Sequence, residues 1–172
     1  MDLLLRPATP ADANALADLG RRAFIAKFGH LYSPVNLALY LGQAHVPATA
    51  ARELADPGLA IAVIEANGVL HAFCKVRFAS TVPHQTAAKR PFELKQLYTD
   101  PDLIGRGLGA QLMDWALAQA RAVNADELQL TVYADNPDAQ RFYARYGLEK
   151  VADITFAVGD HIDPEIVMAV RL

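Results

Sequence analysis

The sequence is poor in cysteine and in excess positive charge. It contains one cysteine, Cys74, in 172 residues. A single cysteine excludes an intramolecular disulfide and a cysteine-based metal site, and it is typical of a protein in a reducing compartment. Because Cys74 lies in an apolar strand pattern, we expect it to be buried. Lysine and arginine number 16 against 19 acidic residues, for a net charge of -3. This balance lacks the basic excess of nucleic-acid-binding domains, so no nucleic acid partner is expected.

Long apolar stretches are also missing. The longest uninterrupted run, Leu59 to Ile64, is far shorter than the roughly 20 residues that a membrane-spanning helix needs. The N-terminus lacks the pattern of a signal peptide. We therefore expect a cytoplasmic protein with no membrane partner. With 53% hydrophobic and 20% charged residues, the chain has an ordinary globular composition, and we expect residues 1–172 to form a single domain.

The most informative segment combines a strand, a glycine-rich turn and a helix. Phe92 to Tyr98 reads as a buried strand, and Asp100-Pro101-Asp102 ends it because proline cannot continue a ladder. Helical spacing then begins inside the glycine run, at Leu108, Leu112, Trp115, Ala116 and Ala120. The unpaired N–H groups of a first helical turn attract anions, and glycine lets a phosphate approach the backbone closely. The segment therefore predicts a phosphate cradle.

Several ligands use such cradles. Gly105, Gly107 and Ala110 satisfy the loose dinucleotide fingerprint, and Glu127 lies near the usual distance for an acid that binds ribose. However, Glu127 precedes the next strand, Leu128 to Tyr133, whereas that acid should follow it. A nucleoside-triphosphate loop is excluded because no Gly-Lys-Ser/Thr sequence is present. A nicotinamide dinucleotide remains a distant alternative.

The segment after the second strand predicts a short helix. Asn136 is the expected N-cap, Pro137 fits the first helical position, and Gly147 fits a left-handed residue at the C-terminal end. Together with the glycine run, this segment resembles the two motifs of the GNAT superfamily of acyl-CoA-dependent N-acetyltransferases. The matching residues are Gly107 and Gly109 in the first motif, and Asn136, Ala139, Tyr143 and Gly147 in the second. Two positions depart from the pattern, since Ile104 replaces the family's Arg or Gln and Leu148 replaces Phe.

The resemblance implies acetyl-CoA as cosubstrate, no metal, and an amine acceptor. It implies that Tyr143 protonates the departing thiolate and that Glu93 is the base, acting directly or through water. Each residue also has a structural interpretation, a packed aromatic for Tyr143 and a solvated strand-end carboxylate for Glu93. The implied cofactor-binding residues are Leu97, Tyr98, Thr99, Ile104, Gly105, Arg106, Gly107, Leu108, Gly109, Ala110, Asn136 and Phe142.

The remaining segments predict three helices and two hairpins. The helices are capped by Thr9-Pro10, Ser33-Pro34 and Pro47, and the hairpins turn at Asn67-Gly68 and Gly159-Asp160. The strands of these hairpins are expected at Leu59 to Glu65, Val69 to Phe78, Glu149 to Val158 and Glu165 to Arg171. The polar loop Ala79 to Pro91 suggests a lid or a cofactor-side flap. For the whole chain we expect the order of a strand, two helices, three strands, a helix, a strand, a helix and two strands. It gives an α/β fold with a mixed, mostly antiparallel seven-stranded sheet flanked by helices.

The acceptor is left open by the sequence. Phe28 to Pro34 resembles a stretch in bacterial GNAT proteins of the spermine/spermidine acetyltransferase kind, and its aromatic residues could wall an acceptor site or form a packed turn. Candidate acceptors are polyamines, amino acids, aminoglycoside-like amines and peptides. Carboxylates for a polyamine would have to come from Glu53 and Asp56, or from Asp153, Asp160, Asp163 and Glu165. A non-catalytic acyl-CoA-binding module is the main alternative function, and either a monomer or a homodimer fits.

Overall fold

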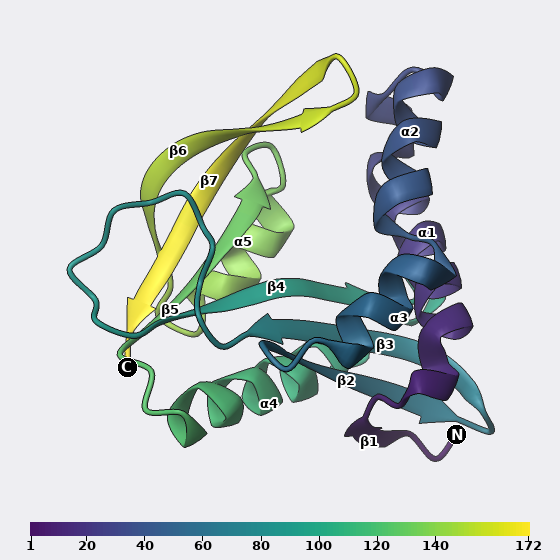
Figure 1. Cartoon of the computed structure of the whole chain (residues 1–172), viewed down its shortest axis with the longest axis horizontal. Coiled ribbons are helices and arrows are strands. Elements are labelled where there is room, and N and C mark those ends of the chain that lie inside the picture. Colours follow the sequence, from purple (N-terminus) through teal and green to yellow (C-terminus); the bar gives the residue numbers. More distant parts are fainter.

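A computed structural model describes all residues 1–172, and a seven-stranded sheet forms its centre (Figure 1). The strands follow the order β1-β2-β3-β4-β5-β7-β6. All neighbouring strands are antiparallel except β4 and β5. The strands are β1 (Leu4–Pro7), β2 (Leu59–Ala66), β3 (Val69–Arg77), β4 (Pro91–Thr99), β5 (Glu127–Tyr133), β6 (Glu149–Val158) and β7 (His161–Arg171). The predicted mixed, mostly antiparallel sheet is confirmed.

Five α-helices flank the sheet. They are α1 (Ala13–Phe28), α2 (Pro34–Ala44), α3 (Pro47–Ala55), α4 (Leu108–Ala122) and α5 (Pro137–Ala144). Three helices precede β2, one after each capping motif, so the expected order with two helices at this place is wrong. Proline residues at the first turn separate α2 and α3, because proline can begin a helix but cannot continue one. None of the helices has the length and apolar character needed to cross a membrane.

The first helix is joined to the sheet by an arginine clamp. Arg6 of β1 donates two hydrogen bonds to Asp12, at 2.8 and 3.0 Å, and a third to Glu65 of β2 at 2.7 Å. The guanidinium lowers the pKa of Asp12 to about 2, so the pair stays charged across the physiological range. The clamp fixes the start of α1 against β1 and β2.

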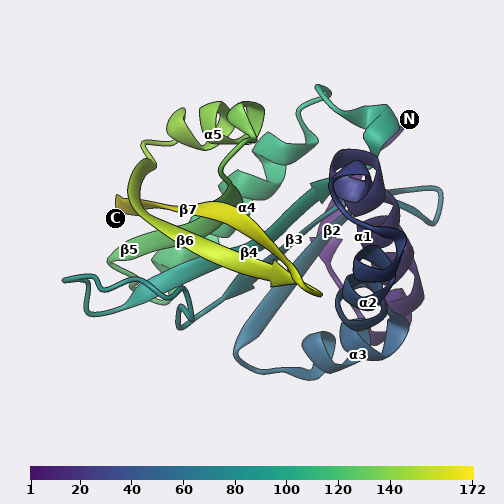
Figure 2. The same cartoon turned by 90° about the horizontal axis from the view of Figure 1, so that it is seen from above.

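Two apolar cores cover opposite faces of the sheet, and Figure 2 shows the two groups of helices apart. The larger core joins α4 and α5 to the sheet, with fully buried Leu112, Met113 and Leu128. The smaller core joins α1 and α3 to β2 and β3 through Leu16, Leu19 and other residues. Cys74 lies in the larger core and is completely buried, as expected.

Both predicted hairpins are present. Asn67 and Gly68 have positive φ angles of 52° and 78°. A tight hairpin turn requires this conformation, and Asn-Gly pairs adopt it readily. The prediction was wrong about the start of β7, which begins at His161 instead of Glu165. The strand accommodates Pro164, which has no N–H to donate, because β5 has already ended beside this residue. The carbonyl oxygen of Pro164 accepts a hydrogen bond from Ala134 N at 2.9 Å.

The feature that positions the site is a split in the sheet. β4 and β5 pair only from Pro91 to Glu93 on one strand and Glu127 to Gln129 on the other. Beyond Glu93 the two strands diverge, as Figure 1 shows. A register shift between Lys75 and Val76 accompanies the split, so that Lys95 is the extra residue of β4. The main-chain groups of Leu94 to Thr99 that face β5 therefore have no strand partner.

Candidate active site

The start of α4 presents a row of free backbone donors at the open end of the split. The N–H groups of Gly105, Gly107, Leu108, Gly109 and Ala110 have no acceptor in the chain. Gln111 is the first residue to donate into the helix, to Gly107 O at 3.2 Å. Gly105 and Gly107 have positive φ angles of 85° and 80°, which explains why glycine occupies these positions. We call residues 104–110 the cradle.

Side chains contribute little to the cradle. Leu108 is 1% exposed and belongs to the larger core, so only its N–H can meet a ligand. Ile104, the residue that departs from the family's Arg or Gln, is 71% exposed and leaves the backbone donors uncovered. Arg106 is also exposed. The cradle therefore has the main-chain geometry and dipole of an anion site.

Three predicted site residues meet at Gly109. A Cβ atom built on Gly109 would lie 3.5 Å from Phe142 Cζ and 3.6 Å from Leu97 Cδ2. Gly109 thus joins the start of α4, the α5 helix and the strand on one side of the split. Thr99, the last residue of β4, pairs with Ala72 of β3. The structure brings the predicted cradle and the predicted β4 residues together.

Tyr143 lies in α5, with a buried side chain that is 9% exposed. Its hydroxyl makes no hydrogen bond in the chain, so it is not tied to the backbone as a structural tyrosine would be. Burial raises the pKa of Tyr143 well above its ordinary value, with a further contribution from Cys74. The phenol is therefore protonated over the whole neutral range and is available as a donor.

Asn136 caps α5 from the other side of the split. Its side-chain carbonyl accepts a hydrogen bond from Ala139 N at 3.3 Å, as the N-cap prediction required. The side-chain nitrogen donates to no group of the chain. Gly147 has a φ of 85°, and Leu148 N donates to Tyr143 O at 3.4 Å, so the predicted C-terminal glycine turn is confirmed.

Glu93 lies where β4 and β5 stop pairing. Its carboxylate accepts two hydrogen bonds from Thr81, from the backbone N at 2.9 Å and from Oγ1 at 3.0 Å. The expected flap, residues 79–91, is thus attached to the N-terminal end of β4. Lys89 N and Arg90 N attach it further to the Asp126 carboxylate. Because the cradle follows the C-terminal end of β4, the expectation of a cofactor-side flap is wrong.

Aromatic side chains from separate elements gather between the helical layer and the β6–β7 hairpin. The ring centroids of neighbouring members lie 4.4 to 6.0 Å apart. We call this group the aromatic cluster: Phe24, Phe28, Tyr32, Tyr40, His45, Tyr98, Tyr133, Phe156 and His161. The sequence indicated only Phe28 and Tyr32, because no local pattern links rings that lie on different strands and helices.

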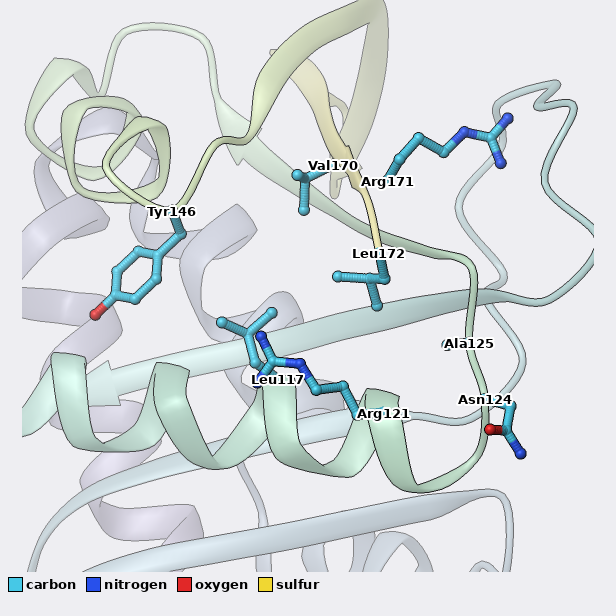
Figure 3. A pocket seen from close by; sticks show the side chains of 8 residues that line it. All are labelled: Leu117, Arg121, Asn124, Ala125, Tyr146, Val170, Arg171 and Leu172. Carbon is cyan, nitrogen blue, oxygen red and sulfur yellow. The ribbon is translucent and has the colours of Figure 1, made fainter.

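Two hollows adjoin the helices that flank the cradle. One, of about 620 Å³, is lined by Asp138, Arg141, Phe142, Ala144 and Arg145 of α5 and its end. The Arg145 guanidinium lies 5.3 Å from the Phe142 ring and has no acidic partner. The other, of about 470 Å³, lies between Leu117, Tyr146 and Leu172 (Figure 3). It borders the C-terminal half of α4 and is remote from the cradle, so it has no part in the site.

Comparison with known proteins agrees with this geometry. The model of the Acetyltransferase (GNAT) family matches residues 22–148. An uncharacterised N-acetyltransferase of Mycobacterium tuberculosis is 31% identical over 161 residues, which cover 94% of this chain and 98% of the relative. The PaiA N-acetyltransferase of Thermoplasma acidophilum, solved with coenzyme A, has the same fold, with a TM-score of 0.81 and 16% identity over the full length of both chains. An acetyltransferase of Salmonella typhimurium, solved with acetyl-CoA, gives a TM-score of 0.73 and 18% identity over 99% of this chain and 94% of the other.

Proposed function

Because the chain belongs to the GNAT family of acetyltransferases, we propose that it transfers the acetyl group of acetyl-CoA directly to a primary amine of a small molecule or peptide. The observation that supports this most strongly is the juxtaposition of the free-donor cradle with the split between β4 and β5. A helix start with unpaired N–H groups suits a pyrophosphate, and two unpaired strand edges suit an extended thiol arm with amide groups. Both requirements belong to coenzyme A.

The cofactor would be held mainly by main-chain groups. The N–H groups of residues 105 and 107–110 would bind the pyrophosphate, and the β4 edge from Leu97 to Thr99 would bind the pantetheine arm. Asn136 has a free side-chain nitrogen that would donate to the arm from the other edge. Arg145 and Phe142 line the neighbouring hollow, where a cation and an aromatic face suit the nucleotide part. The solved relatives with coenzyme A or acetyl-CoA support this choice of ligand.

Direct transfer needs a neutral amine, a polarised carbonyl and a proton for the thiolate. The amine nitrogen attacks the thioester carbon, a C–N bond forms, and the C–S bond breaks. Unpaired N–H groups near Leu97 and Tyr98 would hydrogen-bond the carbonyl oxygen as negative charge develops on it. We assign the proton for the departing thiolate to Tyr143, because its phenol is protonated and has no acceptor in the chain.

The amine proton requires a separate acceptor. We propose Glu93, whose carboxylate lies on β4 where the split begins. One carboxylate oxygen, Oε2, accepts both hydrogen bonds from Thr81, which leaves Oε1 free to take a proton through a water molecule. In this role Thr81 orients the carboxylate. No metal is required by any of these steps.

A free-thiol assay of coenzyme A release tests the proposal. The chain is incubated with acetyl-CoA and a panel of polyamines, amino acids, aminoglycosides and peptides, and the products are identified by mass spectrometry. We expect amine-dependent release that matches the amount of N-acetylated product. Tight acetyl-CoA binding without turnover of any amine would contradict the transferase function and would favour an acyl-CoA-binding regulatory module.

A further inference from the structure

Two carboxylates beside the aromatic cluster have no lysine or arginine partner. Asp163 and Glu165 stand two residues apart on β7 and share one side of the strand. Asp163 is 3% exposed and binds the Tyr32 hydroxyl and His161 Nε2, the latter at 3.0 Å. Glu165 is half-buried and lies opposite Tyr133 of β5. No lysine or arginine nitrogen lies within 4.0 Å of either carboxylate.

Other carboxylates on the helical side of the sheet are compensated. Glu53 pairs with Lys75 and with Lys95, the latter at 3.5 Å, and Asp56 lies 3.8 Å from Arg77. These two acids, which the sequence offered as possible amine ligands, are therefore occupied. Asp163 and Glu165 have no such lysine or arginine partner, and burial of a carboxylate is unfavourable unless hydrogen bonds or a cation compensate its charge.

The surroundings of Glu165 connect it to the split. Burial raises the pKa of Tyr40 to about 12, and the charge of Glu165 adds to this shift. Burial also raises the pKa of Tyr98, with contributions from Tyr40, Tyr143 and Glu165. Glu165 is also the register partner of Tyr133, the residue at which β5 ends beside the split.

His45 supplies an independent sign of an absent ligand. It is 4% exposed, and its Nε2 atom is buried without a hydrogen-bond partner. Its ring centroid lies 5.7 Å from that of Tyr98 and 5.9 Å from that of Tyr40. Burial lowers the pKa of His45 to about 4, so the imidazole is neutral and its free nitrogen can accept a hydrogen bond.

We propose that the aromatic cluster is the acceptor site and that its preferred acceptor is a small diamine. One amine reacts near Tyr143, and Glu165, with Asp163 behind it, holds the second ammonium. The rings of Tyr40, Tyr98 and Tyr133 complement an organic cation because the faces of aromatic rings attract positive charge. This inference rests on the proposed acetyl transfer and specifies the acceptor within it.

The β6–β7 hairpin favours a compact acceptor. Asn36 of α2 hydrogen-bonds the Asp160 carboxylate, and Tyr32 hydrogen-bonds Asp163, so the turn of the hairpin is attached to the helical layer. Figure 1 shows this turn facing the start of α2. An extended polypeptide that entered from this end would have to break both contacts, whereas a short diamine would not.

A matched acceptor series tests the inference. The series compares putrescine with n-butylamine, which lacks the second ammonium, and with γ-aminobutyrate, which carries a carboxylate in its place. Because a hydrogen bond to a charged group contributes more than a neutral one, kcat/KM for putrescine should exceed that for n-butylamine by about 10- to 100-fold. γ-Aminobutyrate should be the poorest of the three.

Glu165→Gln should lower the ratio of kcat/KM for putrescine to that for n-butylamine by at least about 10-fold. Asp153→Asn is the matched control, because Asp153 lies on the same hairpin, is exposed and pairs with Lys150 at 2.8 Å. This control should leave the ratio unchanged. Equal kcat/KM values for putrescine and n-butylamine, or an unchanged ratio in Glu165→Gln, would overturn the diamine site while acetyl transfer stands. Failure of all amines would instead overturn the proposed function.

Discussion

The side chain of Tyr143 is buried, and its hydroxyl has no hydrogen-bond acceptor in the chain. A free phenol beside an open strand edge can donate to a group that arrives with the substrate. The sulfur of coenzyme A fits this position, since it leaves as a thiolate that needs a proton.

Replacing Tyr143 with Phe tests this role. The ring and its packing remain, but the proton donor is lost. We expect kcat to fall by about 10²- to 10⁴-fold, the usual contribution of a general acid, while the acetyl-CoA dissociation constant and the melting temperature stay near wild type. Steady-state kinetics at saturating acetyl-CoA, calorimetry and thermal unfolding measure the three quantities. An unchanged kcat would remove Tyr143 from the mechanism.

Individual residues differ in how far the sequence predicts them. Asn136, Tyr143 and Gly147 belong to one helix with its caps, so their spacing was sufficient to predict their positions. The ion pair of Glu53 with Lys75 joins a helix to a strand, and the contact of Tyr32 with Asp163 joins the two halves of the chain. Such contacts depend on how the elements pack, and no local pattern encodes them.

At the scale of elements, the cradle depends on the backbone at the start of α4. Gly107 has a φ of 80°, a conformation that side chains disfavour, and no other atom lies within 4 Å of the place where its Cβ would be. Glycine is therefore favoured there by the backbone conformation and by the space that a ligand needs, and not by contact with neighbouring residues. The sequence predicted this turn because glycines mark it directly. It did not predict the extra residue at Lys95, because this residue depends on the register of the neighbouring strands.

Gly107→Val should abolish measurable binding of coenzyme A, because a branched side chain would change the turn and enter the space in front of the free N–H groups. The matched control is Gly68→Val in the β2–β3 turn, where φ is 78° and the space is also open. Both variants should lose similar stability, since both force a branched residue into a left-handed conformation. Calorimetry and thermal unfolding separate the two effects, and full affinity in Gly107→Val would contradict the cradle assignment.

At the scale of the whole molecule, helices pack on both faces of the split sheet. The cradle, α4 and α5 lie on one side, and the aromatic cluster, α1, α2 and the β6–β7 hairpin lie on the other (Figure 2). A cofactor and an acceptor can thus approach one reaction centre from opposite sides, as direct transfer requires. The order of elements was predictable from the sequence, but this separation arises from the strand order and the divergence of β4 from β5.

The central claim is that the cradle and the split together form an acyl-CoA site. Calorimetric titration of the full chain with acetyl-CoA, coenzyme A, NAD and NADP tests it most directly. We predict that acetyl-CoA and coenzyme A bind at one site per chain and that neither dinucleotide binds. Binding of NAD without binding of acetyl-CoA would contradict the account.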